Sequence, residues 1–508
     1  MAPHEALVAR YGYRVVSGQP SGTREVVSGS ARVFVAEAIS LPAGLVTAAF
    51  LARRFGPDGY GIFTLTVAIV GWLEWTLVSL FARAAVKLVA DADDWRSAGA
   101  IVLRMFATSG LVGLVALWLA AGPLASLMHE PSLTRHLRLL ALDVPLFMVT
   151  QAHQQVLVGT GAYARRATVA AWRWTARMVL VLVLVGAGLS VDGALIAIIG
   201  ASILELLAAR RFVQPSLRGG SDVDARILWV YALPLFAAAV SLRLFDKLDL
   251  FMLKALGASA AVAGLYGAAQ NLTVIPNLVA LSVTTLLLST LTRMSRAGDL
   301  EGARTLSANA LRGVLVLFPF AGVASGASTA VATMIYGAKF AATGPLLAVL
   351  IFASVMTVMI SIASAILIAA GRPGWAMIAA LPIAPLAFVG HLLVIPKYGA
   401  RGATVVTVVV AGIGALLALI AVHRAWNVWP SLATLARVAV ATALTAVVGT
   451  WWRTTGIMAI VELGVMSLVG VAVIAGLGER SARILQASQS HTLRNREVDC
   501  GKRGAGPD

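Results

Sequence analysis

Apolar residues in this chain come in long blocks, such as Val405–Val422, rather than at the period of an amphipathic helix or a strand. Blocks of about 20 apolar residues span a bilayer as α-helices. Charged residues, glycines and prolines separate the blocks. The pattern predicts an all-α polytopic membrane protein with fourteen transmembrane helices, near residues 32–52, 61–81, 98–120, 138–158, 168–188, 191–209, 228–253, 262–290, 306–334, 345–369, 375–395, 402–422, 432–452 and 457–477.

The composition supports a membrane protein and changes how the charge is interpreted. Of the 508 residues 59% are hydrophobic and 12% charged, with a mean hydropathy of +0.87, whereas a soluble domain carries about 25% charged residues. A net charge of +17 would suggest nucleic acid in a soluble chain. In a membrane protein it fits basic cytoplasmic loops, so no nucleic-acid partner is expected. Residues 1–30 lack the apolar core of a removable signal peptide.

The distribution of basic residues predicts the orientation. With the N-terminus inside, 29 of the 40 Lys and Arg residues fall on the inner side and nine on the outer side. The remaining two, Arg243 and Lys247, lie within the seventh predicted helix. Because Lys and Arg gather in cytoplasmic loops, we expect a multi-pass protein of the cell inner membrane with both termini in the cytoplasm.

Three short matches in the same order indicate an internal repeat. The triplet beginning at Gly61 matches the one at Gly264, and the offsets of all three matches lie between 203 and 210 residues. The other two matches pair Gly161 with Gly371 and Gly193 with Gly402. Six helices per half would insert both halves the same way up, as in transporters whose lobes rock around a central site. The expected organisation is a tail (1–31), an N-lobe (32–209), a linker (210–227), a C-lobe (228–422), two added helices (432–477) and a basic tail (478–508).

Three motifs resemble those of Wzx-type polysaccharide-biosynthesis flippases. These motifs are LARRFGPDGYGIFTLTVAIVGWLEW, LFDKLDLFMLKALGASAAVAGLYGAAQNL and IPKYGARGATVVTVVV. The family exports lipid-linked oligosaccharides and belongs to the multidrug/oligosaccharidyl-lipid/polysaccharide exporter superfamily. The resemblance implies two six-helix lobes in a V around a cationic cavity. It also implies transport of an undecaprenyl-pyrophosphate-linked glycan, driven by a gradient of H⁺ or Na⁺, alongside glycosyltransferases and a glycan polymerase of the same pathway.

Basic residues at helical spacing are the candidate contacts for such an anionic substrate. Arg83 and Lys87 form an i,i+4 pair at the inner end of the second helix, and Arg243 and Lys247 form one in the seventh. Arginine suits a pyrophosphate because its planar fork donates two parallel hydrogen bonds. The alternative for Arg83 and Lys87 is ordinary cytoplasmic charge.

Acidic residues within helices are the candidates for ion coupling, because ionisable groups in the hydrocarbon are costly. They are Glu74, Asp246 and Asp249, and the alternative for the last two is an internal salt bridge with Arg243. Lys254 is expected at the outer end of its helix, in reach of water. Pro42 and Pro234 are candidate hinges, since proline removes a helical hydrogen bond.

Other function classes find less support. The chain has no P-loop and no metal-binding spacing, so no cofactor or metal is expected. No loop is long enough for a catalytic domain, so we do not expect an enzyme. A drug/cation antiporter of the same superfamily remains an alternative. A membrane glycan polymerase or ligase is a further one, resting on the outer segment 122–137 with His129, Glu130, Arg135 and His136.

Overall fold

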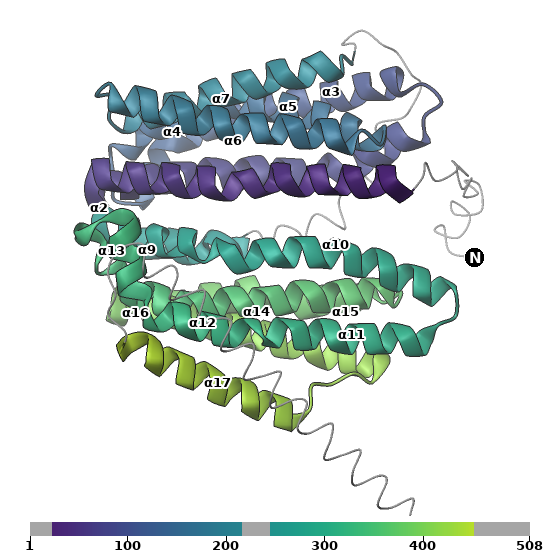
Figure 1. Cartoon of the computed structure of the whole chain (residues 1–508). Coiled ribbons are helices and arrows are strands. Elements are labelled where there is room, and N and C mark those ends of the chain that lie inside the picture. Colours follow the sequence, from purple (N-terminus) through teal and green to yellow (C-terminus); the bar gives the residue numbers. More distant parts are fainter. Residues whose placement is uncertain (1–22, 216–243, 452–508) are drawn as a thin grey trace, which may run out of the picture.

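The computed structural model describes residues 23–215 and 244–451, and within them every regular element is a helix. The helices form two bundles that approach each other at one end and diverge toward the other (Figure 1). The predicted all-α, V-shaped exporter fold is therefore confirmed. Pro234, Arg243 and the predicted helix at 457–477 lie outside the described residues.

The first bundle, the N-lobe, is built around one long element. Helix α2 runs over Thr23–Asp91 and turns back at Gly56 (φ 68°), so it supplies both the first and second predicted helices. Only glycine adopts this φ without strain. Pro42, the predicted hinge, lies in the first arm, where no break in the helical backbone occurs. The bundle is completed by α3 (Trp95–Leu127), α4 (Leu133–Ala141), α5 (Asp143–Gly159), α6 (Tyr163–Gly186) and α7 (Val191–Phe212).

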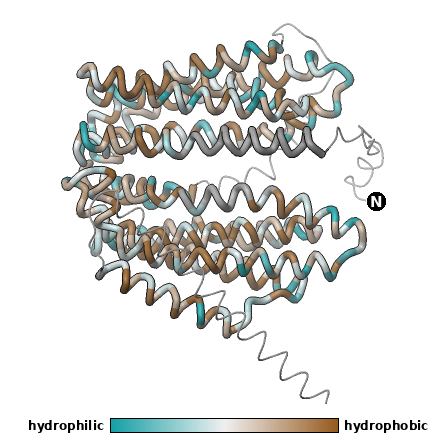
Figure 2. The backbone as a smooth tube through the Cα atoms, in the orientation of Figure 1, coloured by the Kyte–Doolittle hydropathy of each residue, from teal (hydrophilic) through white to brown (hydrophobic). Residues whose placement is uncertain are grey.

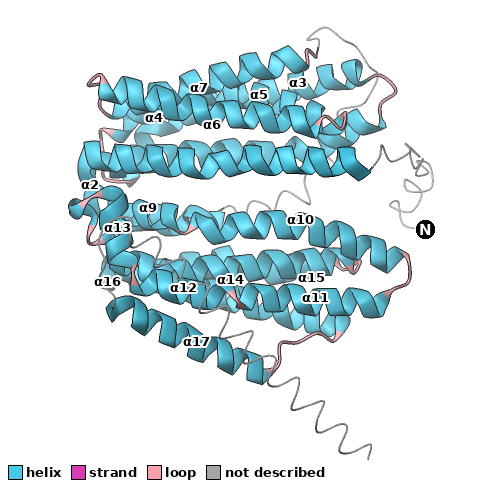
Figure 3. Ribbon diagram, viewed as in Figure 1, coloured by secondary structure: helices cyan, strands magenta, loops and turns pink. Residues whose placement is uncertain are grey.

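The second bundle, the C-lobe, shows more breaks than the apolar pattern predicted. It begins with helical residues 244–255 and continues through a series of shorter and longer helices. The predicted helix at 306–334 is divided among three elements, and Gly399 (φ 55°) breaks α16 much as Gly56 breaks α2. The elements are α9 (Ala260–Leu272), α10 (Val274–Arg296), α11 (Leu300–Leu315), α12 (Leu317–Gly326), α13 (Ser328–Tyr336), η1 (Ala338–Phe340), α14 (Thr343–Ala369), α15 (Pro373–Ala380), α16 (Ile383–Trp426) and α17 (Leu432–Trp451). Figure 3 shows the same order of helices and short loops.

The outer faces of both bundles are apolar. Among the described residues, eight helices are long and apolar enough to cross a membrane. Large apolar side chains project from them, including Val112, Leu119 and Leu393, each about two-thirds exposed. Hydrophobic residues dominate the length of the helices, and hydrophilic ones gather toward their ends (Figure 2). Exposed apolar surface on this scale is stable in lipid rather than in water, so the chain is a multi-pass membrane protein.

Candidate functional site

The two lobes meet where α2 leaves its break at Gly56 and packs against α9. Gly61 and Gly264 face each other there: a Cβ added to either would lie 2.9 Å from the backbone nitrogen of the other. Tyr60 also contacts the C-lobe here, because Asn271 Nδ2 donates a hydrogen bond to its hydroxyl at 2.8 Å. Its ring also lies 5.7 Å from that of Phe340. This end of the V is therefore tightly closed.

Charged residues strengthen the closed end. Lys254 Nζ lies 3.3 Å from Glu130 Oε2, which joins the C-lobe to the loop after α3 in the N-lobe. The expectation that Lys254 reaches water was wrong, because its residue is only 2% exposed. Its partner lies 124 residues away and could not be inferred from local sequence. Arg53 Nε donates to the Ile335 carbonyl at 3.0 Å, also across the lobes.

Within the C-lobe, Asp249 is buried and held by neutral donors. Tyr266 Oη and Gln270 Nε2 each donate to its carboxylate at 2.7 Å, and Thr407 Oγ1 donates at 3.2 Å. Lys247 Nζ donates to Gln270 Oε1 at 3.2 Å, so the amide links the cation to the carboxylate. The hydrogen bonds come from α9 and α16, elements that the sequence did not connect with the seventh helix.

Asp246 and Asp249, both candidates for ion coupling, differ in their exposure. Asp249 is 2% exposed, whereas Asp246 is exposed. Asp246 therefore does not share the hydrogen-bonded site of Asp249, although the two residues are only three positions apart.

The N-lobe holds a second cluster of ionisable groups around Glu74. Glu74 on α2, Asp143 on α5 and Glu205 on α7 are each 5% exposed or less. Gln154 Nε2 donates to Glu205 Oε1 at 2.7 Å. Glu74 and Asp143 interact directly with each other. Three carboxyl groups at this depth are costly unless cations or protons offset them.

The cations of this N-lobe cluster are Arg173 and Arg177, four residues apart near the middle of α6. Arg173 Nη1 lies 3.5 Å from Glu205 Oε2, and its guanidinium lies 4.6 Å from the centre of the Phe147 ring. Both arginines interact electrostatically with Glu74 and Asp143. Both are among the 29 basic residues predicted to lie on the inner side. Their i,i+4 spacing within the predicted span 168–188 was the signal that could have identified them.

Arg83 and Lys87 lie apart from both clusters. They are exposed and lie on the last turns of α2. The structure therefore brings neither of them into the hydrogen-bonded groups around Asp249 or Glu74.

The residues that suggested a polymerase or ligase are engaged in ion pairs. Glu130 pairs with Lys254, and Arg135 Nη2 lies 2.6 Å from Asp192 Oδ2. His136 Nε2 lies 3.4 Å from the other oxygen of Asp192. The Arg135–Asp192 contact holds α4 against α7, and the Glu130–Lys254 contact holds the loop between α3 and α4 against the C-lobe.

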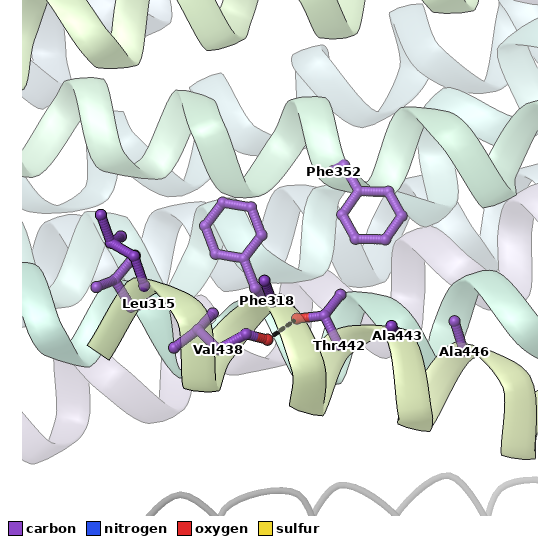
Figure 4. A pocket seen from close by; sticks show the side chains of 9 residues that line it. Leu315, Phe318, Phe352, Val438, Thr442, Ala443 and Ala446 are labelled. Atoms are coloured by element: carbon purple, nitrogen blue, oxygen red, sulfur yellow. Dashed lines mark hydrogen bonds between the residues drawn. The ribbon is translucent and has the colours of Figure 1, made fainter. Parts of the chain in front are cut away.

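A pocket lies between α17 and the helices α11, α12 and α14. Its lining is almost entirely apolar and includes Leu315, Phe318, Phe352 and Val438 (Figure 4). The one polar side chain, Thr442, donates its hydroxyl to the Val438 carbonyl of its own helix at 2.7 Å. Such a lining suits hydrocarbon and not a charged headgroup.

These features define a helical membrane transporter with two lobes and ionisable groups inside each lobe. The family model for polysaccharide biosynthesis proteins matches residues 26–294, so the chain belongs to that family. No curated protein sequence matches the chain.

Solved structures share the fold at low sequence identity. The lipid II flippase MurJ in an inward closed conformation is 14% identical, with a TM-score of 0.70 over 89% of this chain and 99% of that one. A multidrug resistance MATE transporter in an inward-facing conformation is 16% identical, with a TM-score of 0.56 over 78% and 95%. A transporter from Pyrococcus furiosus is 14% identical, with a TM-score of 0.56 over 87% and 96%. All three belong with this chain to one fold, the V-shaped exporters.

Proposed function

We propose that this protein is a flippase that moves an undecaprenyl-pyrophosphate-linked oligosaccharide, such as an O-antigen, capsule or exopolysaccharide unit, across the cytoplasmic membrane. The observation that carries the proposal is a two-lobed membrane bundle with a basic side chain within the helices of each lobe, Lys247 in one and Arg177 in the other. Fixed positive charge at this depth suits a pyrophosphate headgroup. The apolar pocket beside α17 is suited to a prenyl chain.

Transport would proceed by alternating access. The lobes close at the end that the charge distribution predicts to be outside, so the substrate would enter from the cytoplasm, where Arg83 and Lys87 lie exposed. The headgroup would then pass to Lys247 in the C-lobe. Opening of the Gly61–Gly264 contact would release it outside.

Coupling to an H⁺ or Na⁺ gradient would use the buried acidic residues. Asp249 is the stronger C-lobe candidate, because its carboxylate is buried among a hydroxyl-rich set of partners. Glu74 is the N-lobe candidate. Asp246 is exposed and would act only when the lobes rearrange.

Deletion of the gene tests the proposal. Undecaprenyl-linked glycan should accumulate on the cytoplasmic side of the membrane, and a plasmid copy should reverse the accumulation. Unchanged amounts and sidedness of the lipid-linked glycan in the deletion strain would refute this function. Glycosyltransferase and glycan polymerase genes beside this one would identify the pathway.

A drug/cation antiporter is the second candidate, because multidrug transporters share the fold. The cations Arg177 and Lys247 would repel a cationic drug, whereas they would attract an anionic lipid. Drug efflux from cells that express the protein distinguishes the two functions, since a flippase should leave drug resistance unchanged.

A further inference from the structure

The N-lobe cluster contains one cation without a close anionic partner. Arg173 pairs with Glu205 at 3.5 Å, which leaves Arg177 to offset both Glu74 and Asp143. Among the residues that the structure describes, Arg177 makes no hydrogen bond and no ion pair within 4.0 Å. Its charge therefore acts on the two carboxyl groups without a direct ion pair, and its five N–H donors remain available.

Arg177 faces the interior of the N-lobe, near the part of α2 that contacts the C-lobe. It lies on the side of α6 opposite to the exposed stripe of Thr175, Val179 and Val183, and it is half-buried. It also interacts electrostatically with Tyr60, which contacts the C-lobe through Asn271. The guanidinium therefore lies within one side chain, Tyr60, of the contact between the lobes.

Glu74 and Asp143 are buried and interact with each other. Glu74 Oε1 and Asp143 Oδ1 are both buried and accept no hydrogen bond from any described residue. Two carboxylates side by side cannot both stay ionised in a poorly solvated site without a counter-ion. A single proton on one carboxyl oxygen would remove the repulsion and supply a donor for the other.

We propose that Arg177 is a counter-ion shared between the Glu74–Asp143 pair and the pyrophosphate of the substrate, so that anion binding and proton uptake are linked within the N-lobe. This inference rests on the proposed function. When a phosphate oxygen takes the fork of Arg177, the carboxyl pair keeps only the weaker compensation from Arg173, which is engaged by Glu205, and binds one proton from water. When the substrate leaves, Arg177 returns to the pair and the proton is released.

The other ionisable groups around Arg177 favour this exchange over simple neutralisation. On α2 it is faced by Tyr60 and Glu74, and on α5 by Asp143, whereas Glu205 on α7 interacts with Arg173. Arg173 on its own helix repels it and is already paired with Glu205. Among the carboxylates that the structure describes, a substrate anion therefore competes with Glu74 and Asp143 for Arg177.

The test measures binding and proton uptake together on the purified full-length protein in lipid nanodiscs. The probe is undecaprenyl pyrophosphate, with undecaprenol as the uncharged control. Calorimetric titration in buffers of different ionisation enthalpy counts the protons bound per ligand. We expect about one proton taken up by the wild type near neutral pH, with tighter binding as the pH falls.

Variants separate the two halves of the mechanism. The double variant Glu74→Gln/Asp143→Asn should still bind the probe but take up no proton. Arg177→Gln should bind it about ten- to a hundredfold more weakly, as expected for a lost charged hydrogen bond, and Arg177→Lys should recover part of the affinity. Arg165→Gln, on the exposed face of the same helix, is the matched control and should behave as the wild type.

The outcomes distinguish this inference from the function on which it rests. Binding without proton uptake in the wild type, or normal binding by a folded Arg177→Gln variant, would refute the shared counter-ion alone. If Arg177→Gln does not fold, unchanged affinity in Arg177→Lys together with proton uptake in the double carboxyl variant would refute it equally. Failure of the wild type to bind the probe would refute both this inference and the proposed function.

Discussion

Gly61 and Gly264 occupy matching positions in the two repeats and face each other at the contact between the lobes. A Cβ on Gly61 would overlap the Ala260 carbonyl oxygen, and one on Gly264 would overlap that of Pro57. The lobes can approach this closely only because both residues lack a side chain. The pair therefore marks the point at which the closed state is most sensitive to added volume.

Substitution of Gly61 by alanine should open the closed end. The added methyl group meets backbone atoms that cannot move aside, which costs about 1–3 kcal/mol in a packed interface. A cost of this size shifts a two-state equilibrium about five- to a hundredfold toward the open form. Distances between spin labels on the two lobes, measured by pulsed electron paramagnetic resonance, would report the shift. Gly71→Ala is the control, because no atom lies within 4 Å of a Cβ at that position; closed lobes in Gly61→Ala would contradict the prediction.

The ion pair between Lys254 and Glu130 should stabilise the same closed state. Lys254 is buried, and its Nζ lies 3.3 Å from Glu130 Oε2. Glu130→Gln therefore removes the anion that offsets the charge of Lys254. Loss of one member of a buried pair costs about 3–5 kcal/mol, and removal of both costs less. We therefore expect Glu130→Gln to open the lobes more than Lys254→Met/Glu130→Gln does. Equal lobe distances in the single and double variants would show that the pair makes no contribution.

Asp249→Asn should abolish gradient-driven transport while the fold survives. Asparagine keeps the volume but loses the charge, and its single oxygen can accept only one of the two hydrogen bonds that Tyr266 and Gln270 donate to separate oxygens at 2.7 Å. Transport of a fluorescent lipid-linked oligosaccharide into proteoliposomes, with H⁺ or Na⁺ gradients imposed separately, measures the loss and identifies the ion. Asp246→Asn is the paired comparison and should reduce transport less, since Asp246 is exposed. The reverse order would place coupling at Asp246.

The contact between Gly61 and Gly264 also shows what the sequence could predict. Both glycines were identified as repeat equivalents, because the triplets around them match and apolar blocks define the helices on which they lie. The fold followed from the same blocks, since a bilayer requires helices of a minimum length. Their mutual contact did not follow, because it depends on how two lobes dock.

The interior charges were harder to predict for two physical reasons. Arg173 and Arg177 were counted with the cytoplasmic charge, because the preference of basic residues for the inside says nothing about the depth of a particular side chain. They lie instead near the middle of α6, against carboxyl groups from three other helices. Thr407, the hydrogen-bond partner of Asp249 on α16, lies 158 residues away along the chain. Such pairings depend on tertiary packing, which local spacing does not specify.

Glu205→Gln should destabilise the N-lobe far more than a comparable change on its surface. Glu205 is 1% exposed and accepts a hydrogen bond from Gln154 while pairing with Arg173. Its neutralisation leaves the Arg173 guanidinium buried without its closest anion, which costs about 3–5 kcal/mol. The control is Arg135→Gln, which breaks the pair with Asp192 but involves an arginine side chain that is 79% exposed; exposed pairs contribute about 1 kcal/mol or less. Thermal unfolding in detergent should therefore show a large loss for Glu205→Gln and a small one for Arg135→Gln. Replacing both partners, Arg173→Met/Glu205→Leu, should recover much of the stability, whereas additive losses in the double variant would contradict a direct pair.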